Sequence, residues 1–232
     1  MIYVMSDLHG EYEKYCQMLE NINFSNNDIL YVVGDVIDRG KEPLKILEDM
    51  SMRSNVYPII GNHEVMAIEV LEDLLLEITE ENCQKYIISD TLIKLTEWQQ
   101  NGGEVTLNQF KDLSHEEREI MLDYLKEFST LEIVEIDKKT FILVHSGFAS
   151  FEPEKALDEY TPYDVAFIKP DYDRRLFRDK SIYIVAGHTP TFYITGKNEI
   201  YQSNNYICID CGATFGGKLA CLRLDDMAEF YV

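Results

Sequence analysis

The segment Tyr31–Gly40 has the sequence YVVGDVIDRG. Its apolar start ends at a glycine, after which come two carboxylates three positions apart, Asp35 and Asp38, and then Arg39. Taken alone, the pattern fits a strand that runs into a polar turn. The same pattern recurs along the chain, and this recurrence indicates that the polar side chains have a chemical role.

Four further apolar runs also end in side chains that can bind a metal ion. They are IYVMSDLHG with Asp7 and His9, VYPIIGNHE with Asn62, His63 and Glu64, TFILVHSG with His145, and IYIVAGHT with His188. Four of the five histidines therefore follow apolar runs, whereas His115 falls in a helical stretch and is expected on the surface. Histidines scattered through a core would not gather in this way, so the pattern indicates metal-ligand chemistry.

The first part of the chain predicts a parallel β-sheet. Strands expected over Ile2–Met5, Ile29–Val33 and Val56–Ile60 alternate with helices expected over Glu11–Asn21 and Glu42–Met50. This order gives parallel strands joined by right-handed crossovers. Sites in such sheets lie beyond the carboxyl ends of the strands, where the first three polar motifs fall.

The end of the first strand has two interpretations. In extended backbone, Asp7 and His9 are two positions apart and would point to one side as ligands. Alternatively, Ser6 or Asp7 caps the helix that follows. The two interpretations are compatible, because a helix N-terminus beside a strand end also suits an anion.

A helical insertion is expected at about residues 65–128. Helices are predicted over Val65–Glu77, Tyr86–Gln100 and His115–Phe128, the last opened by a capping box of Ser114 and Glu117. The block carries no clear catalytic residue. We expect either a helical layer over the sheet or a lid that shapes access to the site.

The second half of the chain predicts further strands. A hairpin is expected over residues 131–144, then a strand over Ile182–Ala186, and then two strands around the Gly-rich turn near the C-terminal end. We expect these later strands to be antiparallel and joined by hairpins. The predicted fold is therefore α/β, with two packed mixed sheets flanked by helices, in a single domain over residues 1–232.

The composition limits the partners. With 21 Lys+Arg against 42 Asp+Glu, the formal net charge is −21. Nucleic acids and anionic membranes require a basic surface, so neither is expected as a partner. No leader segment or apolar stretch of membrane-spanning length is visible, and the odd number of cysteines, five, predicts reduced thiols in a cytoplasmic protein. An anionic substrate would require local cations, which bound metal ions would supply.

The candidate ligands comprise two carboxylates, three imidazoles and one amide. They are Asp7, His9, Asp35, Asn62, His145 and His188. This set is too large for one tetrahedral site, and its nitrogen and oxygen atoms suit manganese, iron or zinc. Two ions that share one carboxylate fit better, with water between them becoming the hydroxide nucleophile of an in-line displacement.

The motifs DLHG, GDVIDRG, GNHE, HSG and GHT resemble the metal motifs of the phosphoprotein phosphatase family of metallophosphoesterases. The resemblance is greatest to its small bacterial and phage branch, the lambda-phosphatase-like enzymes, and it implies the calcineurin-like metallophosphoesterase fold. Arg39 after the second aspartate motif and Glu64 after Asn-His are typical of this narrower family.

The resemblance implies a role for each residue. Asp7 and His9 would hold the first metal, Asp35 would bridge, and Asn62, His145 and His188 would hold the second metal. His63 would protonate the leaving alkoxide, Asp38 would orient His63, and Arg39 would bind phosphate oxygens. Manganese is the expected metal, with iron, zinc and magnesium as alternatives.

One position departs from the family pattern. Related bacterial sequences carry a Leu-Trp-x-Arg run whose arginine is a second phosphate clamp, and the matching run here ends in Lys169. Lysine keeps the charge but lacks the bidentate fork. The alternative is that Lys169 is a solvated loop residue and that Arg174, Arg175 or Arg178 serves as the clamp.

The expected function is that of a serine/threonine protein phosphatase, a dimetal-dependent phosphomonoester hydrolase. Its substrate would be a phosphorylated protein or a small phosphoester. A hydrolase of dinucleoside polyphosphates, such as diadenosine tetraphosphate, is the alternative with the same chemistry. A third hypothesis, of a different class, is a weakly active, metal-bound regulatory module.

Overall fold

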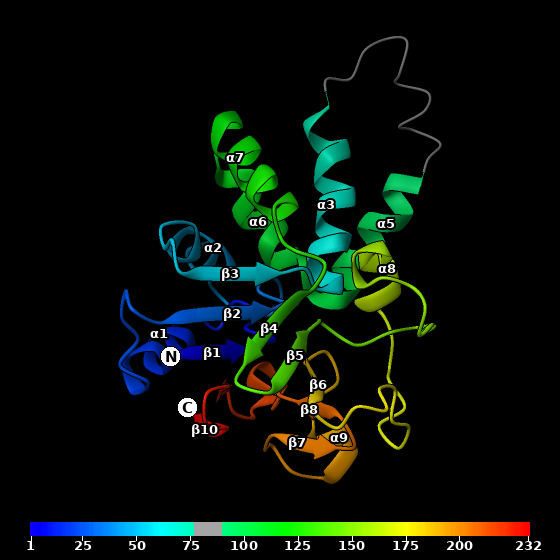
Figure 1. Cartoon of the computed structure of the whole chain (residues 1–232). Helices are drawn as coiled ribbons and strands as arrows, with labels where there is room; N and C mark the ends of the chain where they lie inside the picture. The colour runs from blue at the N-terminus through cyan, green and yellow to red at the C-terminus, as the bar shows by residue number, and fades with distance from the viewer. Residues whose placement is uncertain (77–89) are drawn as a thin grey trace.

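The computed structural model describes residues 1–76 and 90–232, which form two five-stranded sheets with helices outside them (Figure 1). Sheet A has the order β10-β9-β1-β2-β3. Its strands are β1 (Ile2–Met5), β2 (Ile29–Val33), β3 (Val56–Ile59), β9 (Ala220–Arg223) and β10 (Ala228–Tyr231). The β1–β2 and β2–β3 pairs are parallel, as predicted, and the crossovers carry α1 (Tyr12–Asn21) and α2 (Pro43–Ser51).

Sheet B has the order β4-β5-β6-β8-β7. Its strands are β4 (Glu132–Ile136), β5 (Lys139–Leu143), β6 (Ile182–Ala186), β7 (Tyr201–Ser203) and β8 (Tyr206–Cys208). The β4–β5 hairpin is confirmed, but the expectation that the later strands are all antiparallel is wrong, since β5, β6 and β8 pair in parallel. The long segments between these strands leave room for crossovers, which parallel pairing requires.

The Gly-rich segment near the C-terminal end was predicted to join two strands of one hairpin, and this is also wrong. The strand before it, β8, belongs to sheet B, whereas β9 after it belongs to sheet A. The segment therefore connects the two sheets, and β9 pairs with β1. The two labelled chain ends consequently lie on the same side of the molecule, beside sheet A (Figure 1).

The sheets pack face to face. Val4, Val33 and Ile59 of sheet A form one buried cluster with side chains of sheet B that include Phe141 and Val185. On β1 the neighbours of Val4 point the other way, into a second cluster that contains α1 and α2 side chains. Both faces of the central strands are thus covered, which explains why their sequences are continuously apolar rather than alternating.

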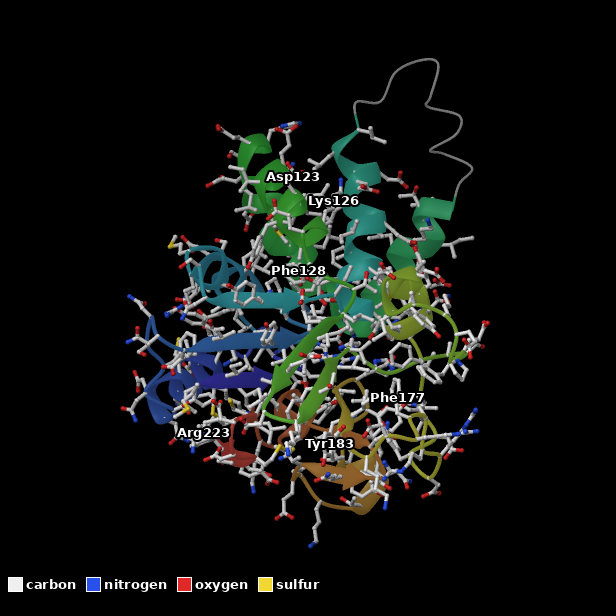
Figure 2. The ribbon with its side chains drawn as sticks, viewed as in Figure 1. Asp123, Lys126, Phe128, Phe177, Tyr183 and Arg223 are labelled. Carbon is white, nitrogen blue, oxygen red and sulfur yellow. The ribbon has the colours of Figure 1, made fainter. Side chains whose placement is uncertain are left out.

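The insertion projects beyond the β3 edge of sheet A (Figure 1). It contains α3 (Asn62–Leu75), α5 (Asp90–Trp98), the kinked turn η1 (Gln99–Gly103), α6 (Glu104–Asp112) and α7 (His115–Lys126). The predicted capping box of α7 is confirmed, whereas residues 77–89, which include the start of the helix expected at Tyr86, lie outside the described residues. Figure 2 shows Lys126 of α7 beside α3, where its Nζ lies 2.7 Å from Glu72 Oε1.

The chain returns from the insertion to the sheet. Backbone bonds join Ser129 to Pro58 and Ile60, which places the start of the β4 region beside the end of β3. The remaining short elements are η2 (Leu157–Glu159), α8 (Pro162–Val165), α9 (Phe192–Thr195) and η3 (Ala213–Phe215). Among the described residues, no helix is both long enough and apolar enough to span a bilayer.

Candidate active site

The predicted site residues come together where the carboxyl ends of strands from both sheets meet. β1 leads to Asp7 and His9, β2 to Asp35, Asp38 and Arg39, β3 to Asn62 and His63 at the start of α3, β5 to His145, and β6 to His188. All of them are buried except His188, which is partly exposed, and Arg39, which is exposed. Residues up to 181 positions apart are in contact, as between Asp7 and His188.

Asp35 lies at the centre of the site. Its Oδ2 is 3.5 Å from His9 Nε2, and its Oδ1 is 3.3 Å from His145 Nε2. Two groups with metal-ligand spacing share this carboxylate: His9, Asp35 and His63 in one, and Asp35, His145 and His188 in the other. Each oxygen of Asp35 thus faces a different group, an arrangement that suits a carboxylate shared by two ions.

Hydrogen bonds fix the orientation of two imidazoles. His9 Nδ1 is 2.9 Å from the carbonyl oxygen of Ile37, and His145 Nδ1 is 2.9 Å from that of Val33. A carbonyl only accepts, so each Nδ1–H donates and each Nε2 points toward Asp35. Burial holds the pKa of His9 well below its usual value, which keeps this imidazole neutral, as a ligand must be.

Asn62 completes the second group. Its Oδ1 is 2.9 Å from His188 Nδ1 and 3.2 Å from His145 Nε2. Burial lowers the pKa of His188 to about 4, so its ring is also neutral near pH 7. One amide oxygen and two imidazole nitrogens therefore converge beside Asp35 Oδ1.

Asp7 and His9 do not have the extended backbone that their spacing suggested. Their φ angles are 53° and 41°, so neither continues β1. The Asp7 carboxylate accepts the backbone N–H of His188, at 3.1 and 3.0 Å, and so connects the ends of β1 and β6. The capping interpretation is also wrong, because α1 begins after Glu11 and no side chain of the described residues caps it.

Positive φ angles are a general property of this site. Besides Asp7 and His9, the residues Asp35, Asp38, Arg39 and His188 have φ between 55° and 71°. Non-glycine residues rarely adopt this left-handed conformation, and it persists only where the surrounding structure enforces it. The strand-end motifs therefore form turns that are held by tertiary contacts, not by local propensity.

Glu64 supplies much of that restraint for the turn after β2. Its fully buried carboxylate accepts the backbone N–H groups of Asp35 at 2.9 Å, Val36 at 2.8 Å, Ile37 at 3.2 Å and Gly61 at 2.9 Å. The sequence analysis used Glu64 only as a residue typical of the family and assigned it no structural role. Its position at N3 of a helix that follows a glycine predicts the bond to the Gly61 N–H, but not the bonds to the turn after β2.

His63 bonds to Asp38 and faces Arg39. His63 Nδ1 is 2.7 Å from Asp38 Oδ2, and His63 Nε2 is 2.9 Å from Arg39 Nη2. Arg39 Nη1 is 2.6 Å from His9 Nε2, so the guanidinium donates to both imidazoles. Because His63 Nε2 is also 3.9 Å from Asp35 Oδ2, this nitrogen opens on the same space as the ligand atoms.

The insertion contacts the site through Asp38, although its sequence showed no clear catalytic residue. Trp98 Nε1 donates to Asp38 Oδ2 at 2.7 Å, and Thr106 Oγ1 donates to Asp38 Oδ1 at 2.6 Å. The Asp38 backbone N–H in turn lies 3.0 Å from Thr106 Oγ1. No sequence pattern signals these contacts, which span 60 and 68 residues and involve side-chain types that are common in cores.

The loop that contains Lys169 lies beside His145. The backbone N–H of Ile168 donates to Ser146 Oγ at 3.2 Å, while the side chain of Lys169 is exposed. The side chains of Arg174, Arg175 and Arg178 are exposed as well. The structure therefore brings this segment to the border of the site. Exposure does not distinguish Lys169 from the three arginines as the phosphate clamp.

The donor set fits a pair of metal ions. His9 and His145 each have a ring nitrogen directed at a shared carboxylate, and their other nitrogen is engaged by a carbonyl, as in histidine ligands generally. Thiolates are absent from the described donor set, so hard or borderline ions with nitrogen and oxygen preference are favoured.

The comparisons with known proteins agree with this chemistry. A family model described as calcineurin-like phosphoesterase matches residues 1–221. The chain belongs to this family. It is therefore a metallophosphoesterase, and the predicted family resemblance is confirmed.

Individual relatives differ in their named substrates. The chain is 30% identical over 232 residues to serine/threonine-protein phosphatase 2 of Escherichia coli strain K12, a match that covers 96% of this chain and 92% of the relative. It is 40% identical over 65 residues to the symmetrical bis(5'-nucleosyl)-tetraphosphatase of Wigglesworthia glossinidia brevipalpis, covering 27% of this chain and only 24% of that protein.

The solved structures support the fold. A crystal structure of a putative diadenosine tetraphosphatase aligns with 100% of this chain and 92% of its own, with a TM-score of 0.67 at 15% identity. The predicted arrangement of two mixed sheets flanked by helices is thereby confirmed as a metallophosphoesterase fold.

Proposed function

We propose that this phosphoesterase is a dimetal-dependent phosphomonoesterase that acts as a serine/threonine protein phosphatase. Asp7, His9 and Asp35 would hold one ion, and Asp35, Asn62, His145 and His188 would hold the other, manganese being the preferred metal. The observation that carries the proposal is the position of Asp35, whose two oxygens face two separate groups of donors.

When bound, a metal pair lowers the pKa of water and neutralises phosphate charge. The protein groups would do the rest. Arg39 would transfer the N–H bonds that it now gives to His9 and His63 to the oxygens of a substrate phosphate, where its planar fork can bind two oxygens at once. This transfer would free His63 Nε2.

His63 would then act as the general acid. In its protonated form it donates the Nε2 proton to the leaving alkoxide, which a serine or threonine ester requires because the alkoxide is a poor leaving group. The Nδ1–H bond to Asp38, at 2.7 Å, fixes the ring plane. His63 is completely buried, so bulk water does not reach its ring.

A cavity beside Arg39 supports a monoester over a dinucleoside polyphosphate. The cavity has a volume of about 430 Å³ and is lined by Arg39, Gln99, Gly102, Glu104, Val105, Asn108 and Gln109. Arg39 is the one basic residue among the described residues that line it. The amide side chains can bond to a peptide backbone, whereas additional phosphates of a dinucleotide placed in this cavity would meet the Glu104 carboxylate.

The test compares two substrates on one preparation. The protein is treated with a chelator and reloaded with Mn²⁺, Fe²⁺, Zn²⁺ or Mg²⁺, and products are measured from a phosphoserine peptide and from diadenosine tetraphosphate. We expect phosphate release from the peptide and restoration by Mn²⁺. Turnover of the dinucleotide to ADP without peptide dephosphorylation would favour the polyphosphate hydrolase. Turnover of neither substrate by the reloaded protein would favour the regulatory module.

A further inference from the structure

Asp38 is a fully buried carboxylate whose two oxygens are both occupied. Oδ2 accepts from His63 Nδ1 and from Trp98 Nε1, each at 2.7 Å, and Oδ1 accepts from Thr106 Oγ1 at 2.6 Å. Since Asp38 is 0% exposed, no water substitutes for these donors at the surface. A carboxylate in such a place is stable only when hydrogen bonds compensate for the lost hydration.

The two donors besides His63 come from the helical insertion. Trp98 ends α5 and is completely buried, and Thr106 lies in the first turns of α6 and is also completely buried. The backbone between them fits closely around the indole, because a Cβ at Gly103 would lie 2.4 Å from Trp98 Nε1. The insertion is therefore built to place an N–H and an O–H group on Asp38.

We propose that Trp98 and Thr106 are positioning residues for the general acid. They hold the Asp38 carboxylate in one rotamer, and Asp38 in turn holds the His63 ring so that Nε2 points at the leaving oxygen. The inference rests on the proposed function, because it assumes that His63 donates a proton to the leaving group. It assigns the insertion a part in the reaction itself.

Thr106 offers the sharpest test. Thr106→Val keeps the shape but removes the hydroxyl, whereas Thr106→Ser keeps the hydroxyl and is the matched control. A serine ester needs a proton at its leaving oxygen, while p-nitrophenolate leaves with little assistance. Each variant is loaded with Mn²⁺, its metal content is measured, and kcat and KM are determined for a phosphoserine peptide and for p-nitrophenyl phosphate.

The expected result is a selective loss. Thr106→Val should lower kcat on the phosphoserine peptide by roughly tenfold or more, a fraction of the 10²–10⁴ that general acid catalysis supplies. Its kcat on p-nitrophenyl phosphate, its KM values and its metal content should change little, and Thr106→Ser should match the parent. Trp98→Phe, which keeps most of the buried ring but loses the N–H, should show the same selectivity and serves if Thr106→Val does not fold.

Comparison with His63→Asn separates the role of the acid from the role of its positioning residues. If His63→Asn loses the same factor on both substrates, His63 is not the acid, and both its proposed role and this inference fall, whereas the phosphatase activity is tested separately by product analysis. If His63→Asn is selective but the Thr106 and Trp98 variants lose equally on both substrates, or lose metal, the inference alone is overturned. Thr106→Val added to His63→Asn should cause no further loss of kcat on the phosphoserine peptide, and a further loss would show that Thr106 acts elsewhere.

Discussion

Replacing Glu64 by glutamine should destabilise the fold strongly although the side chain keeps its size. Each oxygen of Glu64 accepts two backbone N–H groups: Asp35 and Gly61 bond to Oε2, and Val36 and Ile37 bond to Oε1. An amide nitrogen accepts none, so Glu64→Gln leaves two buried N–H groups unpaired. Each costs about 1–3 kcal/mol, and two cost about 2–6 kcal/mol.

The lower half of that range is the better expectation. Burial raises the pKa of Glu64, which means that its charged form carries a desolvation cost that glutamine does not carry. A loss of about 2–4 kcal/mol is still a large part of the 5–15 kcal/mol that usually separates folded and unfolded states. The measurement is the free energy of unfolding of metal-free protein from urea denaturation followed by circular dichroism.

Glu117 provides the control. It occupies the same N3 position in the capping box of α7, but on the surface. Glu117→Gln should therefore change the free energy of unfolding by no more than about 0.5 kcal/mol. If Glu64→Gln were as mild as the control, the four hydrogen bonds would not be what holds the turn after β2. Metal content should fall together with stability, because that turn carries Asp35.

Asp35→Ala should bind neither ion tightly, which metal analysis checks, and two retained ions would contradict a bridging role. His63→Asn should lower turnover of a phosphoserine peptide by roughly two to four orders of magnitude at unchanged metal content. Lys169→Arg should raise catalytic efficiency if Lys169 is the second clamp, and Lys169→Ala should weaken substrate binding by about 1.5–3 kcal/mol. The same loss in an Arg174, Arg175 or Arg178 variant, with Lys169→Ala like the parent, would assign the clamp to that arginine.

The sequence revealed those parts of the site that depend on short-range pattern. An apolar run followed by a polar side chain identifies a strand end, and parallel strands bring their ends to one edge, so Asp7, Asp35 and Asn62 could be grouped from the sequence alone. His145 and His188 were also recognised at strand ends, but their grouping with the other ligands rested on the family resemblance, because their strands were expected to be antiparallel. The sequence did not reveal that Asp35 faces the two groups with different oxygens, because that depends on side-chain rotation in the folded protein.

The features that the sequence did not reveal are non-local. The directions of β6 and β8 are set by irregular crossovers whose path leaves no periodic signal. Trp98 and Thr106 would be assigned to a core by any pattern, since tryptophan and threonine have no chemistry that marks them as partners of a distant carboxylate. The positive φ angles at the strand ends likewise arise from tertiary contacts such as those of Glu64.

The metal-ligand side chains come from both sheets, so the distances between them depend on how the two sheets pack against each other. Asp35 extends from sheet A, while His145 and His188 extend from sheet B, and apolar side chains such as Phe141 and Val185 set the spacing between them. Ion loading and docking of the sheets must therefore stabilise each other by the same free energy. A small apolar substitution in this layer, distant from every ligand, would be measurable as a change in metal affinity.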